Sequence, residues 1–380
     1  MKRKKGKHGR KKSTGSIDWM LVVIVAILIA FGIVMLYSAS SYTSRIDHDG
    51  DSFYYVKKQL FSTAVGFVAM ALVAIVPREF IVKLTPAAAV LAGLSVLMVY
   101  TPLGIESHGA KRWISLGFFS FQPAEAVKIA VILLTALLLC KFKARLEDLK
   151  IYFKVMAGTF AAALLIAFVT DDLGTTIIIF FVGMIMAFLA SKHVKNMLIT
   201  IAVAVVGGVI YVISSSFRME RIMTWLDIES YVTDEGYQIM QGLYAIGSGG
   251  FLGKGLGKST QKMGFVPESQ NDMIFSIICE ELGIIGGIII LGLFAYLVWR
   301  MKKTYDGIAA SDKWGRLVVA GVASHIALQT IINMSVVTNL IPNTGVPLPF
   351  ISYGGSSIIF TLAEIGLVLN ISREMKREIV

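Results

Sequence analysis

Three acidic residues stand where an apolar chain rarely keeps a charge. The stretch PESQNDMIFSIICEELG, residues 267–283, turns from polar to largely apolar at Asp272, and Glu280 and Glu281 then interrupt the apolar run. The pattern predicts Asp272 in the first turn of a membrane helix, where the helix dipole favours an acid by about 0.3–1 kcal/mol. The helix dipole does not explain Glu280 and Glu281, which lie two turns deeper in the helix. Acids at that depth need charged or hydrogen-bonding partners, or a cavity filled with water. We therefore expect a polar site at the mouth of this helix, with Asp272 and the nearby Glu268 among its acids.

Basic residues interleaved with glycines form a second group suited to chemistry. Residues 217–227 and 236–262 combine Lys and Arg with glycine and amide side chains. Glycine lets backbone N–H groups approach an anion, and Lys or Arg neutralises it. The candidate anion ligands are Arg218, Arg221, Gln238, Lys254 and Lys258. Their place next to apolar segments suits a phosphate or pyrophosphate attached to a lipid, and a flexible loop without a ligand is the alternative.

A carboxylate and an ammonium lie three residues apart inside another apolar segment. Glu125 and Lys128 follow Pro123, so on a helix they share a face and can form an ion pair. Inside a bilayer such a pair faces the protein interior. It is either a functional position or a structural staple between helices.

Two more charged clusters lie at the ends of apolar segments. Lys111 and Arg112 precede Trp113, a pattern typical of an interfacial anchor, and they are also candidates for contact with an anionic substrate. Asp171 and Asp172 separate two short apolar segments. We expect Asp171 to occupy a solvated turn that caps the next helix, and Asp172 to be the candidate that points into a cavity.

The composition indicates a membrane protein that must hold these residues on helices. The chain is 56% hydrophobic and 16% charged, whereas roughly a quarter of the residues of soluble domains are charged. A spanning helix needs about 20 apolar residues. On that basis the sequence predicts an all-α polytopic fold of about ten transmembrane helices, at residues 19–41, 59–77, 80–101, 122–141, 153–170, 174–191, 195–214, 272–299, 317–338 and 351–371.

The distribution of basic residues predicts the topology. Most of the 36 Lys and Arg residues fall on one side of the ten-span arrangement, which places the N- and C-termini in the cytoplasm. Residues 1–16 are then a basic cytoplasmic tail and residues 17–380 a single transmembrane domain. A large extracytoplasmic segment, about 215–271, separates spans seven and eight, and we expect it to fold back on the membrane and carry function.

Several classes of partner and cofactor find no support in the sequence. The net charge of +11 suggests nucleic acid, but the basic tail adjoins a spanning helix, so membrane lipids are the expected neighbours and nucleic acid is not. Cys140 and Cys279 lie in apolar segments and are expected to be buried small hydrophobic residues. There is no spacing typical of a nucleotide fingerprint or a zinc site. A metal site is not predicted, although a divalent cation, Mg or Mn, is a candidate cofactor.

Taken in order along the chain, the motifs resemble those of the SEDS family, the membrane glycosyltransferases of cell-wall elongation, division and sporulation (RodA, FtsW and SpoVE types). The match runs through SAS at 38–40, KRWISLG at 111–117, FQPAEAVKIA at 121–130, DLGTT at 172–176, GYQIMQ at 236–241, AIGSGGFLGKGLGKSTQK at 245–262, PESQNDMIFSIICEELG at 267–283 and NTGVPLPFISYGGSS at 343–357. The resemblance implies that lipid II is polymerised into glycan strands outside the membrane. It assigns the essential aspartate to Asp272 and the conserved ion pair to Glu125 and Lys128.

The implied reaction agrees with one well-placed acid. A sugar hydroxyl attacks an anomeric carbon while a polyprenyl pyrophosphate leaves, and an α-linked donor with a β-linked product needs a single inverting displacement with one general base. Asp272 is the candidate base. The cations above, with Lys111 and Arg112, are candidates to bind the pyrophosphate, while Asp172, Glu281 and Ser352 are candidates to line a cavity.

The resemblance also implies partners. A class B penicillin-binding protein is expected, together with divisome or elongasome proteins. The long basic tail, the short loop after SAS and NTGVPLPFISYGG favour the FtsW type, with the RodA and SpoVE types as alternatives. Two rival functions stay open: a lipid II flippase, because intramembrane charges and glycine-interrupted segments suit a transporter, and a non-catalytic scaffold for a penicillin-binding protein.

Overall fold

The computed structural model describes residues 17–107, 110–115, 117, 120–191, 193–230 and 235–374. The basic tail expected at residues 1–16 and the last basic residues, after 374, lie outside this part of the chain. Within it, ten helices are long and apolar enough to cross a membrane. The prediction of an all-α polytopic membrane protein with about ten spans is confirmed.

The spanning helices follow the predicted segments. They are α1 Trp19–Asp47, α2 Tyr54–Ile75, α3 Arg78–Leu97, α4 Pro123–Phe142, α5 Leu149–Val169, α6 Leu173–Ser191, α7 Val194–Ile213, α10 Ile274–Gly307, α11 Lys313–Val337 and α12 Gly355–Glu374. Single turns of 3-10 helix, η1 Met98–Tyr100 and η2 Lys143–Arg145, extend α3 and α4. The ends agree least where charges or glycines interrupt the apolar runs.

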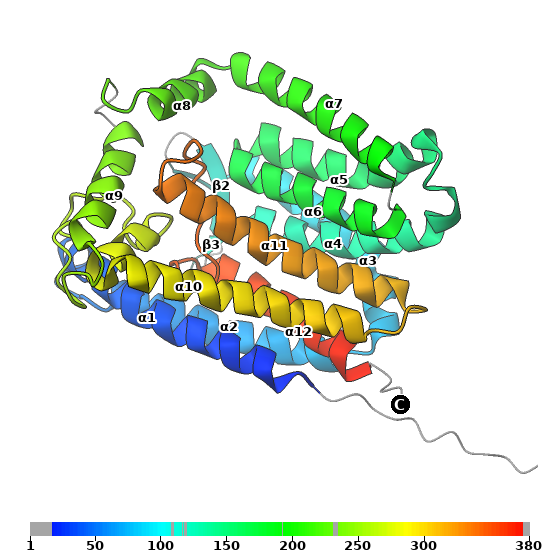
Figure 1. Ribbon diagram of the computed structural model, residues 1–380, viewed down its shortest axis with the longest axis horizontal. Helices are drawn as coiled ribbons and strands as arrows, with labels where there is room; N and C mark the ends of the chain where they lie inside the picture. Colours follow the sequence, from blue (N-terminus) through cyan, green and yellow to red (C-terminus); the bar gives the residue numbers. More distant parts are fainter. Residues whose placement is uncertain are drawn as a thin grey trace, which may run out of the picture.

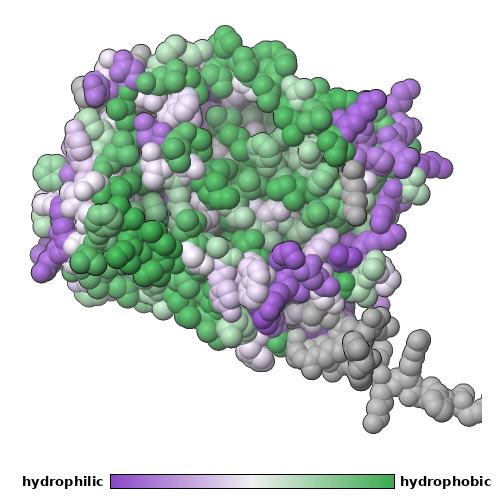
Figure 2. All heavy atoms as spheres, viewed as in Figure 1, coloured by the Kyte–Doolittle hydropathy of each residue, from purple (hydrophilic) through white to green (hydrophobic). Residues whose placement is uncertain are grey.

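Helices α4, α11 and α12 form the centre of the bundle. Between 61% and 78% of their most apolar stretches is buried, compared with 17% for α3 and 11% for α7. Helix α12 packs along α2, and α7 stands at the edge of the bundle (Figure 1). Figure 2 shows an apolar surface across the middle of the molecule with polar residues gathered towards its two ends. A multi-pass membrane protein needs this distribution.

Helix α10 begins two residues later than predicted. Its first residue is Ile274 and its N-cap is Met273, so Asp272 lies in the preceding turn and its expected place in the first helical turn is wrong. The reason is a hydrogen bond from another helix that takes the place of a bond within α10. The Asp272 carbonyl accepts from the Asn333 side chain at 2.7 Å, which directs this backbone group towards α11.

The connections at one end of the bundle contain structure that the periodicity did not predict. Between α3 and α4 the expected loop holds a small antiparallel sheet of β1 Gly104–Ser107, β2 Ala110–Ser115 and β3 Ser120–Phe121. The long segment after α7 forms α8 Ser216–Leu226 and α9 Glu235–Gly249, and α9 packs on α10 (Figure 1). The segment therefore packs on the spanning helices, while its expected contact with the membrane surface stays a prediction.

Helix α10 is broken near its first third. Gly283 has φ +69° and ψ −174°, so a short helix ends at this residue and a long one continues to Gly307. An added Cβ at position 283 would overlap the carbonyl of Phe251 in the loop after α9. Only glycine fits here, because other residues rarely adopt these backbone angles and any side chain would overlap Phe251.

We predict that Gly283→Ala lowers the apparent melting temperature of the protein in detergent. The backbone conformation alone costs of order 1–3 kcal/mol for a residue with a side chain, and the overlap with Phe251 adds to it. Gly292→Ala in the same helix is the matched control, since its added Cβ meets no neighbour within 4 Å. Equal melting of the two variants would contradict the role given to Gly283.

Candidate active site

Asp272 is a largely buried carboxylate held between three elements. Its residue is 9% exposed, and it lies in the turns that precede α10. From α11, the Asn333 side-chain amide donates to the Asp272 carbonyl at 2.7 Å and to the Val346 carbonyl at 2.8 Å. From α9, Gln238 Nε2 donates to Asp272 Oδ1 at 3.4 Å. The structure thus brings together two predicted site residues, Asp272 and Gln238.

Arg112 reaches the same place from β2. An added Cβ on Gly345 would lie 3.9 Å from Arg112 Nη1 and 4.0 Å from Asp272 Oδ2, so the cation and the carboxylate meet across this glycine. Gly345 has φ +64°, a conformation that other residues rarely adopt. Arg112 is oriented by two backbone carbonyls, since its Nε donates to Thr170 at 3.0 Å and its Nη2 to Asp171 at 2.8 Å.

A hollow between α6, α7 and α8 contains two more of the predicted cations. Arg218 and Arg221 line it, together with Tyr211 and Asn343. Arg218 is already engaged, because its Nη2 lies 2.9 Å from Asp171 Oδ1 and its guanidinium lies 3.7 Å from the centre of the Tyr211 ring. The hollow is therefore lined by arginines of which at least one is balanced by a carboxylate.

The roles expected for the two adjacent aspartates are reversed. Asp171, predicted to cap the next helix, has φ +51° and pairs with Arg218. Asp172 takes the capping role instead: its two oxygens accept from the backbone N–H and the hydroxyl of Thr175, each at 2.8 Å. Its carboxylate is directed at its own helix and not into a cavity. The left-handed backbone at Asp171 turns that side chain away from the helix start.

The remaining predicted ligands lie elsewhere. The ammonium of Lys254 lies 2.6 Å from Glu280, whereas Lys258 is exposed. Glu268 accepts a hydrogen bond from the Asn271 side chain. Ser352 accepts from the Leu348 backbone N–H at 2.8 Å and is buried within its own loop. Lys111 is half-buried on β2. A substrate-binding role for Lys111, Lys254, Lys258 and Glu268, and a cavity-lining role for Ser352, stay predictions.

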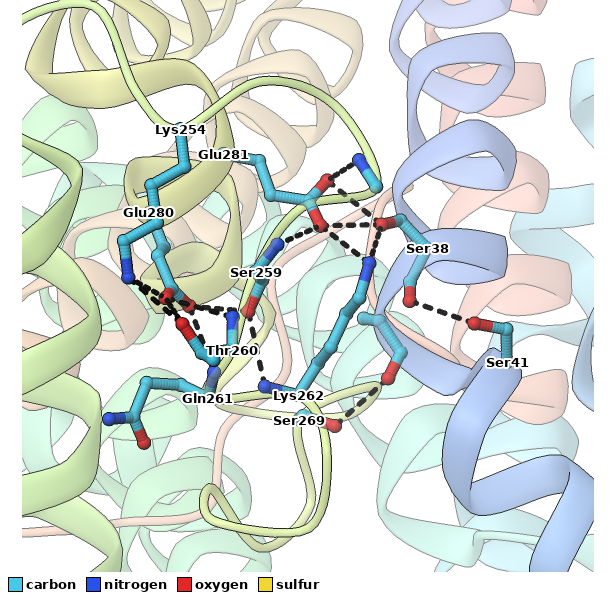
Figure 3. Close-up of polar contacts among 12 residues, drawn as sticks. Ser38, Ser41, Lys254, Ser259, Thr260, Gln261, Lys262, Ser269, Glu280 and Glu281 are labelled. Atoms are coloured by element: carbon cyan, nitrogen blue, oxygen red, sulfur yellow. Dashed lines mark hydrogen bonds and ion pairs between the residues drawn. The ribbon is translucent and has the colours of Figure 1, made fainter.

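Glu280 and Glu281, both fully buried, are the centres of one polar cluster (Figure 3). Glu281 accepts from the Ser38 hydroxyl at 2.7 Å, from Lys262 at 2.8 Å and from the Gly257 backbone at 2.9 Å. Glu280 accepts from Lys254, Ser259, Thr260 and Gln261 of the same loop. These acids therefore have partners, and the partners tie the loop after α9 to both α10 and α1.

A second chain of buried polar groups crosses the bundle centre. The predicted ion pair is present, with Lys128 Nζ 2.9 Å from Glu125 Oε1 and both side chains 4% exposed. Lys128 also donates to Gln329 Oε1 at 3.0 Å, and His325 Nε2 lies 2.8 Å from the same oxygen. On its other side, His325 Nδ1 lies 2.7 Å from Glu364 Oε2. The chain joins α4, α11 and α12.

This chain connects to the site through Gln329. Because its oxygen accepts from Lys128 and His325, its amide nitrogen faces the other way and donates to the Pro347 carbonyl at 3.0 Å. Asn333, one helical turn further along α11, holds the neighbouring Val346 carbonyl. Two amides of α11 thus position the 343–350 loop, which carries Gly345.

Tyr353, whose backbone N–H donates to the Gln270 carbonyl at 2.9 Å, is not a candidate base. Burial raises the pKa of Tyr353 to about 12, with the neighbouring Tyr54 and Tyr55 adding to the shift, so this phenol stays protonated. In the described part of the chain, no three His, Cys, Asp or Glu side chains gather in a way that could hold a metal ion.

Comparison with known proteins identifies the family. The family model described as "Cell cycle protein", which covers FtsW, RodA and SpoVE, matches residues 18–377. This chain belongs to the FtsW/RodA/SpoVE family. It is 37% identical over 359 residues to stage V sporulation protein E of Bacillus subtilis, covering 94% of this chain and 97% of that protein. It is also 37% identical over 364 residues to the probable peptidoglycan glycosyltransferase FtsW of Geobacter sp. (strain M18), with the same coverage.

Solved structures share the fold of this family member. One is a chain from work described as "Structural coordination of polymerization and crosslinking by a peptidoglycan synthase complex", with a TM-score of 0.77, 25% identity, and coverage of 96% of this chain and 99% of that one. The rod shape determining protein RodA of Thermus thermophilus matches with a TM-score of 0.68 and 26% identity over the same shares.

The sequence did not single out several residues that shape the site of this family member. Lys262 was not separated from the other loop cations, and Asn333, Gln329, His325 and Glu364 were not selected. Polar residues at 325, 329 and 333 recur one turn apart within an apolar helix, which is a signal for a polar stripe facing the protein interior.

We predict that Asn333→Leu lowers the melting temperature and loosens the turn that holds Asp272. The change keeps the side-chain size but leaves two buried carbonyls without a donor, and each such group costs about 1–3 kcal/mol. Thermal unfolding and hydrogen exchange of residues 268–276 measure the effect. Thr330→Val is the control, because the Thr330 hydroxyl bonds only to its own helix, at Ile326. Exchange rates as low as in that control would contradict the assignment.

We also predict that Lys128→Met is more destabilising than the double variant Glu125→Gln/Lys128→Met. Removing one partner of a buried ion pair leaves an uncompensated charge and costs about 3–5 kcal/mol, while removing both avoids that penalty. The comparison is made by thermal unfolding in one detergent. If the double variant were less stable than Lys128→Met alone, the Glu125 charge would not be the cause of the instability of that single variant.

Proposed function

We propose that this chain is a peptidoglycan glycosyltransferase that polymerises lipid II into glycan strands at the outer face of the bacterial cytoplasmic membrane. The observation that carries the proposal is the buried Asp272 carboxylate, which meets Arg112 across Gly345 at the end of a membrane bundle. Membership of the FtsW/RodA/SpoVE family supports it, as does a relative named as a probable peptidoglycan glycosyltransferase.

The proposed reaction is one inverting displacement. The 4-hydroxyl of an N-acetylglucosamine unit attacks the anomeric carbon of the donor sugar, and the new oxygen–carbon bond forms as the bond to the pyrophosphate breaks. Asp272 takes the hydroxyl proton as general base, and the polyprenyl pyrophosphate leaves with the electron pair. The α-linked donor gives a β-linked product, so no second nucleophilic carboxylate is needed.

Arg112 is the first candidate to stabilise the leaving group. Its guanidinium and the Asp272 carboxylate both approach Gly345, so they lie no more than about 8 Å apart, and a fixed cation at that place can neutralise charge that develops on a leaving pyrophosphate. Arg218 and Arg221, in the adjoining hollow, are candidates for the distal phosphate. Lys111 and Lys258 are further candidates.

The orientation in the membrane is part of the proposal. Charged groups at the end of the bundle opposite Asp272 include the Arg300–Asp18 pair and the basic residues Lys302 and Lys303. Cytoplasmic ends carry an excess of Lys and Arg, which supports cytoplasmic termini and an extracytoplasmic Asp272.

A class B penicillin-binding protein is the proposed partner, because a glycan strand must be cross-linked to form a wall. A structural neighbour comes from a complex described as coordinating polymerization and crosslinking, which supports this pairing. We place the chain in cell division, as an FtsW-type enzyme, with divisome proteins around it. A role in elongation with elongasome proteins is the alternative.

The decisive experiment is polymerisation of labelled lipid II by the purified protein. We expect Asp272→Asn to lower the rate about 10²–10⁴-fold, the usual contribution of a general base. Asp227→Asn is the matched control, since Asp227 is an exposed acid of the same segment whose carboxylate bonds to Ser230. Both variants must melt at the temperature of the wild type.

The rival functions give different outcomes in the same assay. Equal polymerisation by Asp272→Asn and the wild type would remove Asp272 from its role. Movement of lipid II across vesicles without polymer would favour a flippase. Polymer formed only when an active penicillin-binding protein supplies the glycosyltransferase would favour a scaffold.

A further inference from the structure

In the loop that follows α9, cationic groups contact buried acids while large apolar side chains are exposed. Residues 250–265, called here the 250–265 loop, direct the ammonium groups of Lys254 and Lys262 onto Glu280 and Glu281, with the Lys262 side chain buried and that of Lys254 33% exposed (Figure 3). The apolar side chains of the same loop point outward. Their exposed fractions are 76% for Phe251, 80% for Leu252, 55% for Leu256, and 49% for Met263 and Phe265. A loop in water would be expected to arrange these groups the other way round.

The backbone of the loop satisfies the break in α10. The last carbonyls of the short helix, those of Glu280 and Glu281, accept from the N–H groups of Lys254 and Gly255, each at 2.9 Å. The first N–H groups of the long helix, those of Ile284 and Ile285, donate to the carbonyls of Gly250 and Phe251. In hydrocarbon every backbone polar group needs an internal partner, and this arrangement provides them at an otherwise open helix break.

The position of the break along α10 puts the loop at membrane depth. Trp299 is 44% exposed and lies under the ammonium of Lys303, as is typical of an aromatic residue at a membrane boundary. Fifteen residues separate Ile284 from Trp299, or about 23 Å of helix, which is less than the roughly 30 Å thickness of the hydrocarbon layer. The break therefore falls inside the apolar layer, near its far boundary.

The exposed apolar surface of the loop continues an exposed apolar face of α10. Ile284, Ile285, Ile288 and Ile289 of α10 are between 43% and 62% exposed. Phe251 is hydrogen-bonded through its carbonyl to Ile285, so its side chain extends this surface.

We propose that the 250–265 loop is inserted in the membrane leaflet on the Asp272 side, with Phe251 and Leu252 among the acyl chains. The exposed Lys258 then lies at the level of the lipid headgroups and favours anionic ones. The occupant of this surface is bilayer lipid, and the ion pairs that Lys254 and Lys262 form with Glu280 and Glu281 make insertion tolerable. Only the identity of the leaflet as the outer one rests on the proposed function.

The test measures the depth of a nitroxide label on Leu252→Cys, in a Cys140→Ala/Cys279→Ala background. The protein is placed in vesicles of phosphatidylethanolamine and phosphatidylglycerol, and the label's collisions with oxygen, which partitions into lipid, are compared with those of a water-soluble nickel chelate. Ile288→Cys on α10 is the lipid reference, and Glu229→Cys, on an exposed turn after α8, is the water reference.

Insertion predicts an oxygen-to-nickel ratio at position 252 that is close to that of position 288 and severalfold higher than that of position 229. A ratio like that of position 229 would overturn the proposal, as would protection from both reagents, which indicates a protein neighbour.

In a second measurement, undecaprenyl phosphate is added to the same labelled vesicles. A fall in oxygen collisions would assign the surface to a polyprenyl chain and would also overturn the proposal. Label depth does not depend on catalysis, so an inactive protein leaves this test valid.

Discussion

The site depends on two amide side chains one turn apart on α11. Gln329 receives hydrogen bonds from Lys128 and His325 on its oxygen, and this fixes its nitrogen towards the Pro347 carbonyl. Asn333 then bridges the carbonyls of Asp272 and Val346. A buried amide can make both connections because it carries a donor and an acceptor on one rigid group. The position of the carboxylate is thereby linked to the charged chain at the bundle centre.

In both buried charge clusters, at least one glutamate pairs with a group from another segment of the chain. In the bundle centre, Glu125 pairs with Lys128 and Glu364 lies 2.7 Å from His325 Nδ1, and the chain joins three helices. At the break in α10, Glu280 and Glu281 draw the cations of the 250–265 loop inward. Buried ion pairs add little stability over apolar packing of the same volume. What they do here is connect separate segments: the first cluster joins α4, α11 and α12, and the second joins the 250–265 loop to α10.

The sequence was informative where the interaction is local. Ten apolar runs predict ten helices, and the spacing of three residues between Glu125 and Lys128 predicts their ion pair. It was uninformative where partners come from distant segments, as for Lys128 and Gln329, which lie 201 residues apart. The reversal of Asp171 and Asp172 has another cause: two adjacent acids before a helix look alike in sequence, and a left-handed backbone angle decides which one becomes the cap.

The sequence also does not show which of the cations are already paired with acids of the protein. Composition treats Lys254, Lys262 and the arginines alike, as charges available to an anionic substrate. The fold divides them, because acids of the chain itself engage Lys254, Lys262 and Arg218. Arg112 is oriented by carbonyls, which aim its guanidinium without cancelling its charge. A pyrophosphate near Asp272 would therefore meet Arg112 before Lys254 or Lys262, whose ammonium groups are held by Glu280 and Glu281.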